Sequence, residues 1–384
     1  MMIKRTLGLI FLILVTTFFS QDLLTAIIIL GWTYRWVGYL VKRRLFRLSP
    51  LSNTFTWNQF LIREKNNNQD ISNYSYPKLW ETPQQIKCLN HPRFKWLHRI
   101  LYSLKLHFKI GLSGILATWI FTLIPCLLCA YAWYVGWHIS FNKMYEQSET
   151  GASLGFLGTI LFTVIMLYVT LAQARYALTK DWRSFLSFKL IKIWVCHRPL
   201  QLFILAISYL FSSFILFIIK IIPVFLPIIN PDLESLNSTQ ALQFLNDYYF
   251  WTGIISLGLF FALKMMAGFI YSGVLVETWQ KNIVTEYDLH QEEIYYLNKF
   301  RFSSNLTYSN QKPIQRIIIS SVSIAYRSSL IILIFFTWFL FSFLPFISDF
   351  FNYYPQRGFL NQPLVQIPCF RYVPQSLEDN KKRV

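Results

Sequence analysis

Acidic residues are scarce in this sequence. Only 18 of its 384 residues are Asp or Glu, and charged residues of both signs make up 14%, whereas a soluble globular protein carries about 25%. None of these acids lies in the five longest apolar runs. The scarcity excludes an ordinary water-soluble fold, and it leaves those runs without the paired carboxylates that an intramembrane protease or a proton-coupled pump would use.

Motifs for known chemistry are missing as well. The chain has no Walker loop, no GxSxG, no HExxH and no dinucleotide-binding GxGxxG. Its histidines do not assemble the three or four ligands that a metal site needs, so we assign no metal, no cofactor and no catalytic residue. The close pair Cys126 and Cys129 lies in an uncharged apolar run, where we expect two small apolar residues on one helix face rather than a redox motif.

Apolar residues, in contrast, make up 54% of the chain, and aromatic residues 18%. A bilayer core about 30 Å thick is crossed by roughly 20 apolar residues in a helix, because unpaired backbone groups are too unfavourable in hydrocarbon. Five stretches meet this length, at residues 110–137, 154–172, 200–219, 248–276 and 328–347. We predict an all-α, polytopic transmembrane helix bundle, with about six or seven membrane segments once the N-terminus is included.

The first 48 residues contain two further apolar runs, 7–19 and 23–41, separated by Gln21 and Asp22. Basic residues precede the first run as in a signal peptide, but Phe18 stands where a cleavage site requires a small residue. Three interpretations remain: a signal peptide or signal anchor, one long bent helix, and a membrane hairpin. We carry forward the hairpin over residues 1–48.

Basic residues determine the predicted orientation. Lys and Arg are concentrated in 42–109, 175–198 and 277–316, whereas the intervening 138–153 and 221–247 are nearly neutral or acidic. Positively charged connections stay in the cytoplasm. The alternation therefore predicts that all three basic regions lie on the cytoplasmic side.

This orientation assigns the remaining segments. We predict a cytoplasmic loop over residues 49–92 and an extracytoplasmic tail over 348–384, which is rich in proline and aromatic residues and should pack on the helix ends. Pro223, Pro227 and Pro231 follow the third clear span. Proline at every fourth residue should prevent a regular helix there.

Two basic stretches have the pattern of helices lying on the membrane. Residues 93–109 repeat apolar side chains at helical spacing between lysines and arginines, and residues 182–194 show a looser version. We expect these helices, and the residues after 41, to contact anionic lipid headgroups through Lys42, Arg43, Arg44, Arg47, Lys95, Arg99, Lys105, Lys109, Arg183, Lys189 and Lys192. The net charge of +18 is thus attributed to the lipid bilayer and not to nucleic acid.

Lys264 is the most informative single residue, because it lies near the middle of the run 248–276. A charge at that depth is unfavourable, and a functional role is the default hypothesis. The competing interpretation is a tilted span whose lysine reaches the headgroups. Asp22 and Arg35 are weaker candidates, since Asp22 is the acid that a buried hairpin would bring towards Lys264, and Arg35 lies seven residues before the basic cluster at Lys42.

Three segments resemble a domain-of-unknown-function family of multi-pass bacterial membrane proteins. They are LAQARYALTKDWRSFLSFKL at 171–190, GYL at 38–40 followed by basic residues, and FALKMMAGFIYSG at 261–273. The resemblance implies a protein of the bacterial cytoplasmic (inner) membrane. It transfers no catalytic residue.

Three functional hypotheses follow. The first is a non-enzymatic assembly, scaffold or helper protein, whose basic surface engages lipid or a membrane-protein partner. The second is a transporter or permease for an anionic or lipid-like solute that uses Lys264, and the third is a membrane-embedded lipid-modifying enzyme. An internal repeat and a water-filled cavity at Lys264 would favour transport, whereas a cluster of acid and base groups would favour an enzyme.

Overall fold

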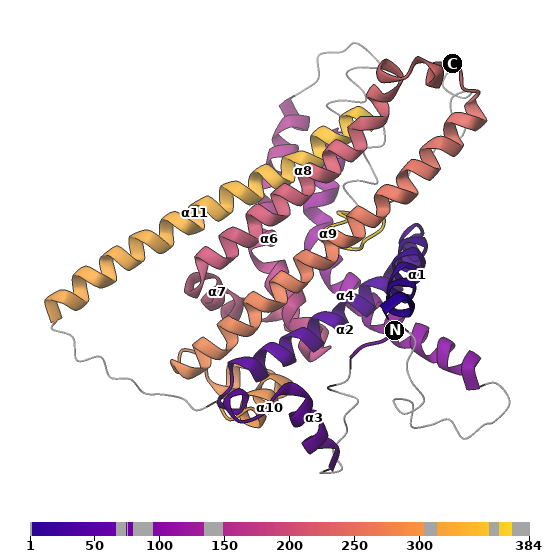
Figure 1. Ribbon diagram of the computed structural model, residues 1–384. Coiled ribbons are helices and arrows are strands. Elements are labelled where there is room, and N and C mark those ends of the chain that lie inside the picture. The colour runs from indigo at the N-terminus through magenta and orange to yellow at the C-terminus, as the bar shows by residue number, and fades with distance from the viewer. Residues whose placement is uncertain are drawn as a thin grey trace.

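The computed structural model describes residues 2–66, 74, 76–79, 95–133, 149–302, 313–352 and 361–370. Every regular element in these ranges is a helix (Figure 1). The α-helices are α1 (Met2–Ser20), α2 (Leu23–Leu48), α3 (Trp57–Asn66), α4 (Lys95–Trp133), α6 (Glu149–Thr179), α7 (Phe188–His197), α8 (Pro199–Ile229), α9 (Ser238–Gln280), α10 (Gln291–Lys299) and α11 (Pro313–Asn352). Short 3-10 helices are η1 (Pro50–Asn53), η5 (Trp182–Leu186), η6 (Pro231–Ser235) and η7 (Glu286–Asp288).

Six of these helices, α2, α4, α6, α8, α9 and α11, are long and apolar enough to cross a membrane. The predicted all-α, multi-pass bundle is therefore confirmed. Helix α2 packs against α4 and α9, α6 packs against α4 and α11, and α8 packs against α9 and α11. Each helix pairs its own backbone groups internally, so its apolar side chains are free to face either lipid or another helix.

The helices are longer than the apolar runs that predicted them. Residues 93–109 were expected to form a separate interfacial helix, but from Lys95 onward they are continuous with the following span in α4. Ser103 and His107 in that stretch are fully buried, so part of it packs inside the protein. A helix of 39 residues is about 58 Å long and extends well beyond a bilayer core.

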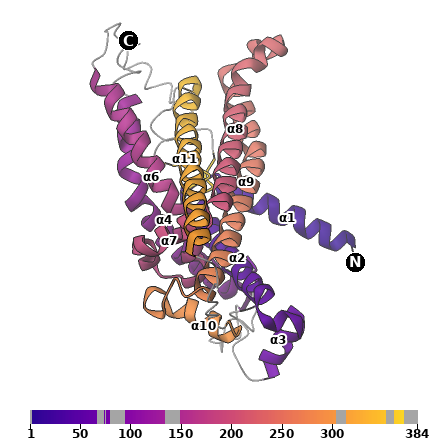
Figure 2. The same ribbon diagram turned by 90° about the vertical axis from the view of Figure 1, so that its left-hand side faces the viewer.

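The prediction that the prolines after the third clear span prevent a regular helix is wrong. Helix α8 continues through Pro223 and Pro227 to Ile229, and η6 begins at Pro231. A proline removes one hydrogen bond from a helix but does not end it where neighbouring groups and local adjustment keep the backbone satisfied. The hairpin of α8 and α9 therefore extends further from the bundle than the sequence suggested, as Figure 2 shows.

At the N-terminus, α1 and α2 are separate helices joined by a turn at Gln21 and Asp22. The turn packs on α9, where a Cβ added to Gly253 would lie 2.8 Å from Nε2 of Gln21. In Figure 2, α1 leans away from the bundle towards its N-terminus. This arrangement separates Asp22 from the centre of the bundle.

Helices α2 and α4 cross at unusually short range. A Cβ added to Gly31 would overlap the backbone carbonyl of His107, and one added to Gly111 would overlap the carbonyl of Ile27. Small residues at a crossing let two backbones approach closely, which is a common way to hold helices together in a membrane.

The basic connections fold together at one end of the bundle. Helices α3, α7 and α10, with η5, η7 and the described residues 74 and 76–79, form a layer that we call the platform (Figure 2). Its parts are joined by an ion pair between Lys299 and Glu64 at 2.8 Å and by a hydrogen bond between the hydroxyls of Tyr74 and Tyr295 at 3.3 Å. Phe46, Phe60 and Phe300 pack between them. The rest of the predicted loop 49–92, at 67–73, 75 and 80–92, lies outside the described residues.

The C-terminal region differs most from the prediction. We expected residues 348–384 to lie as a tail on the helix ends, but 361–370 lie inside the bundle, where Val365 and Ile367 are fully buried. We call residues 361–370 the C-terminal plug; Figure 1 shows it in yellow beside α9. Residues 353–360 and 371–384 of the predicted tail lie outside the described residues.

Candidate functional site

Lys264 lies at the contact between α9 and the C-terminal plug. It is 2% exposed, and its ammonium group donates to Oε1 of Gln173 on α6 and, at 2.9 Å, to the carbonyl oxygen of Val365 in the plug. The hydroxyl of Tyr209 on α8 lies 3.5 Å away. The three protons of an ammonium therefore have three oxygen atoms around them, from three parts of the chain.

None of the partners that the structure gives Lys264 is acidic. The ring centroids of Phe260 and Tyr209 lie 5.0 and 5.9 Å from Nζ, close enough for their π faces to attract a cation. The lysine is thus held by neutral dipoles and aromatic rings. This arrangement resembles the carbonyl coordination of a monovalent cation more than it resembles an ion pair.

A second row of amides and hydroxyls connects the plug to α4. Nε2 of Gln173 donates to the Val365 carbonyl at 2.8 Å and to Oγ1 of Thr118 at 3.1 Å. Gln366 accepts from Nε1 of Trp119 at 3.1 Å and donates to Oγ1 of Thr122 at 2.8 Å. A non-helical backbone at membrane depth is tolerated only where protein groups pair it, and these residues supply the pairing.

Lys264 lies far from the platform end of α9. It precedes the last helical residue, Gln280, by 16 positions, which is about 24 Å along the helix. A membrane-surface lysine reaches only a few ångströms along its stem, and here the stem is buried among protein side chains. The snorkelling interpretation therefore does not describe this residue.

The two weaker candidates lie elsewhere. Asp22 is exposed in the turn beside Gly253, which is 11 residues and about 16 Å from Lys264 along α9. Arg35 lies within electrostatic range of His107 and Lys42. The structure therefore brings neither Asp22 nor Arg35 to Lys264.

The predicted interfacial cations differ in how far their side chains are exposed. Lys42 is buried, with its ammonium 4.9 Å from the ring centroid of Tyr296, and Arg44 and Arg99 are half-buried. The side chain of Lys95 lies outside the described residues. The others are exposed: Arg43, Arg47, Lys105, Lys109, Arg183, Lys189 and Lys192.

A second buried charge cluster joins the bundle to the platform. Arg175 on α6 and Glu293 on α10 are 3% and 0% exposed and form a two-fold ion pair, with Nε to Oε1 at 2.9 Å and Nη2 to Oε2 at 2.7 Å. Glu293 also accepts from the hydroxyl of Tyr271 at 2.5 Å and from the backbone N–H of His290 at 2.7 Å. The Arg175 guanidinium lies 5.7 Å from the ring centroid of Trp194 on α7.

The carboxylate of this cluster is fully engaged, whereas Nη1 of Arg175 is buried without a hydrogen-bond partner among the described residues. Both oxygens of the carboxylate are occupied by donors, so Glu293 offers no lone pair at an open surface. A bidentate pair of this kind fixes orientation as well as proximity. The arrangement therefore holds α10 and α7 against α6 and α9.

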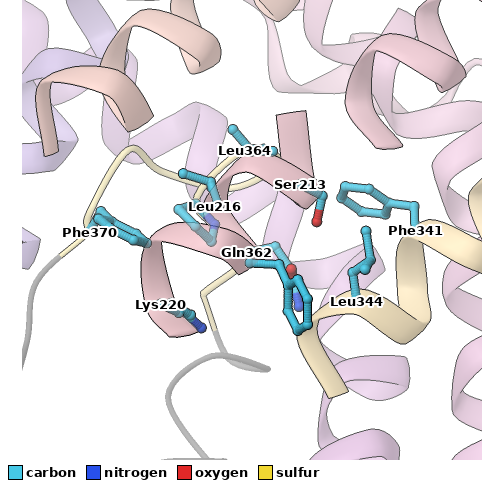
Figure 3. A pocket seen from close by; sticks show the side chains of 10 residues that line it. Ser213, Leu216, Lys220, Phe341, Leu344, Gln362, Leu364 and Phe370 are labelled. Atoms are coloured by element: carbon cyan, nitrogen blue, oxygen red, sulfur yellow. The ribbon is translucent and has the colours of Figure 1, made fainter. Parts of the chain in front are cut away.

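A small cavity of about 30 Å³ lies beside the plug, between α8 and α11. Figure 3 shows that Ser213, Lys220, Gln362 and Phe341 line it, together with apolar side chains. A volume of this size holds one or two water molecules. It does not accommodate an organic solute in the conformation described.

Sequence reasoning found Lys264 but missed the groups that surround it. Its partners Gln173, Tyr209 and Val365 are 91, 55 and 101 positions away in sequence, and only the fold brings them close. The separate Arg175–Glu293 pair was missed as well. One signal was present: two glutamines, Gln362 and Gln366, stand in an otherwise apolar stretch near the C-terminus. Polar amides in such a stretch indicate buried partners.

No protein-family model, curated protein or solved structure matches this chain. The resemblance to a family of bacterial membrane proteins therefore stays a prediction. The functional argument rests on the residues and their geometry.

Proposed function

We propose that the protein is a non-enzymatic scaffold or assembly helper, which presents the platform at the cytoplasmic face of a bacterial inner membrane. The observation that carries this proposal is the Arg175–Glu293 pair. It anchors the platform to the bundle through two hydrogen bonds between opposite charges, and an anchored surface loses less conformational entropy on binding a partner than a loose loop does.

The surroundings of Lys264 and the size of the cavity beside the plug support the same proposal. Lys264 is surrounded by protein acceptors, and the cavity near the plug holds at most one or two waters. Among the described residues, no acid–base pair lies beside Lys264. The cavity beside the plug has no room for an organic substrate in this conformation. The platform, in contrast, presents exposed apolar side chains, including the fully exposed Tyr287 and Ile62 at 60%, which suit a protein partner.

Site-specific photo-crosslinking in cells tests this proposal. A photoreactive residue at Tyr287 or Ile62 should give a discrete adduct with the same protein partner, whereas one at Ile120, a lipid-facing position on α4 that is 67% exposed, should give none. Absence of an adduct from both platform positions would contradict the proposal.

A matched pair of variants shows whether the anchored platform is required. R175M leaves Glu293 as a buried carboxylate without its cation, and losing one member of a buried pair costs about 3–5 kcal/mol, so the adducts should weaken strongly. R175M combined with E293Q removes both charges and keeps one acceptor oxygen, which accepts from either the Tyr271 hydroxyl or the His290 N–H. The double variant should recover the adducts; equal losses in both would contradict an anchoring role for the pair.

A specific observation favours transport as a second candidate. Lys264 is an intramembrane cation beside a non-helical segment, a combination found at the substrate sites of transporters. Proteoliposomes loaded with chloride or inorganic phosphate separate the two functions. Efflux that K264Q abolishes would support transport, and absence of efflux together with platform adducts would support the scaffold.

A further inference from the structure

One face of α9 carries four positions spaced four residues apart near the platform. Phe269, Gly273, Glu277 and Lys281 follow one another there, and positions at this spacing lie on the same side of a helix. The face ends at the C-cap of α9, Lys281. It therefore runs from the apolar part of the span to the membrane boundary at the platform end.

Two arginines from neighbouring parts of the chain lie on this face of α9. The guanidinium of Arg44, on α2, is 4.7 Å from the ring centroid of Phe269. Arg198, which precedes α8, covers Gly273 so closely that an added Cβ would lie 2.5 Å from its Nη1. The absence of a side chain at Gly273 is what lets this guanidinium lie on the surface of α9. We call Arg44, Arg198, Lys281 and the four positions on α9 the cationic stripe.

The cationic stripe has more positive than negative charge. Glu277 pairs with Arg198 at 2.6 Å and with Lys281 at 2.6 Å, so one carboxylate serves two cations. Arg44 makes no ion pair with an acid among the described residues, and it lies within electrostatic range of Arg198 and Arg47. An anion between the two guanidiniums would relieve their repulsion.

The depth of these groups matches the headgroup region. Arg44 is in the last two turns of α2, Arg198 directly precedes α8, and Lys281 caps α9, so three helix ends place their cations along the platform end of α9. Arg44 lies beside Phe269 and Arg198 one turn further, beside Gly273. Lys281 follows about 12 Å beyond Gly273 along the helix. The Phe269 ring, 38% exposed, lies one turn deeper than Gly273. An anionic phospholipid has a charged headgroup next to an apolar chain. Two guanidiniums beside an exposed aromatic ring match both parts of such a molecule.

We propose that the cationic stripe binds the phosphate headgroup of an anionic phospholipid from the platform-side leaflet. Arg44 and Arg198 contact the phosphate oxygens, since a guanidinium presents its donors in a fork that fits phosphate, and Phe269 contacts the upper part of an acyl chain. The site needs neither Lys264 nor the scaffold function, because it depends on contacts around α9 alone.

Native mass spectrometry of the purified protein tests this site. Palmitoyl-oleoyl phosphatidylglycerol should be retained in preference to the matching phosphatidylcholine. R44Q and R198Q should each weaken retention about fivefold, in line with the contribution of one cation at a membrane surface. The control K65Q makes the same charge change at an exposed position on α3, outside the cations expected to contact lipid headgroups, and should leave retention unchanged.

A second variant removes no charge. In G273A the methyl group displaces the Arg198 guanidinium, so retention of phosphatidylglycerol should fall while net charge is preserved. This variant gives an independent answer if R198Q fails to fold. Equal retention by wild type, R44Q and G273A would overturn the proposal, as would loss equal to theirs in K65Q. Inorganic phosphate that competes at equimolar concentration would show that the site takes a free anion and not a lipid.

Discussion

At the scale of single residues, Lys264 shows how a charge can be accommodated far from water. A lone ammonium in a low-dielectric medium is strongly unfavourable, but here two oxygen acceptors contact Nζ, a third lies at 3.5 Å, and two aromatic faces surround it. The residue also links α9 to the C-terminal plug through the Val365 carbonyl. The contacts that stabilise the charge of Lys264 therefore also hold the plug in the bundle.

Replacement of Lys264 by Met should destabilise the bundle. The Val365 carbonyl keeps Nε2 of Gln173 as a donor, but Oε1 of Gln173 loses its buried partner, and one unsatisfied buried group costs about 1–3 kcal/mol. Unfolding of detergent-solubilised K264M, followed by tryptophan fluorescence, measures the loss. K189M, at an exposed position, should change the free energy of unfolding by less than about 0.5 kcal/mol.

The opposite result would also be informative. If K264M were as stable as the wild type or more so, the lysine would be a net cost, as buried charges often are when apolar residues replace them. A buried charge that lowers the stability of the protein indicates a functional role. That outcome would favour the transport hypothesis over a structural role.

His197 should make stability depend on pH. Its pKa is lowered from the usual 6.5, first because burial disfavours the imidazolium and also because Lys281 and Arg327 repel it; the Glu277 carboxylate, 3.0 Å away, opposes the shift without cancelling it. A histidine with a lowered pKa contributes stability above about pH 6.5, the unfolded value, and that stability decreases as pH falls towards the folded pKa.

Thermal unfolding at pH 5 and pH 7.5 measures this effect. The wild type should lose more stability at pH 5 than H197Q does, because the glutamine takes up no proton. Equal pH dependence in the two proteins would contradict the assignment.

At the scale of elements, hydropathy located the spans but not their ends. The centres of all five predicted runs fall within α4, α6, α8, α9 and α11, because an apolar run of that length can only be helical in lipid. The ends extend further because helix propagation continues in polar sequence once a helix is nucleated. For that reason α8 passes two prolines and α4 absorbs a segment expected to be separate.

The crossing of α2 and α4 should be sensitive to one methyl group. G31A places a Cβ against the backbone of His107, which cannot move as a side chain can, and such overpacking costs about 1–3 kcal/mol. Gly258 is the matched control, since a Cβ there meets nothing within 4 Å, and alanine favours a helix over glycine.

Unfolding of the two alanine variants in the same detergent compares them directly. G258A should be as stable as the wild type or more stable, and G31A should be less stable. Destabilisation of similar size in both would show that the effect is not specific to the crossing.

At the scale of the whole molecule, the fold has a cluster of polar contacts inside an apolar core and a basic end. The plug enters the bundle to contact Lys264, while the platform gathers three basic connections that are far apart in sequence. Orientation is still a prediction from charge, although the clustering of those connections at one end agrees with the single side that the positive-inside rule requires.

Cysteine labelling tests that orientation. In a background without the five native cysteines, Cys at Thr239, exposed near the start of α9, should react with a membrane-impermeant maleimide on intact cells. Cys at Tyr287, exposed on the platform, should react only after permeabilisation. Reversed labelling would place the platform outside and contradict the proposed cytoplasmic surface.

The sequence by itself determined the class of fold, the approximate position of the spans and the unusual character of Lys264. These follow from local composition, since the periodicity and length of an apolar run restrict the backbone wherever the run occurs. Only the tertiary structure decided what Lys264 touches, that Arg175 and Glu293 pair, and that the C-terminal residues enter the bundle. Those contacts join residues as many as 247 positions apart, and the local sequence pattern gives no information about distances between positions so far apart.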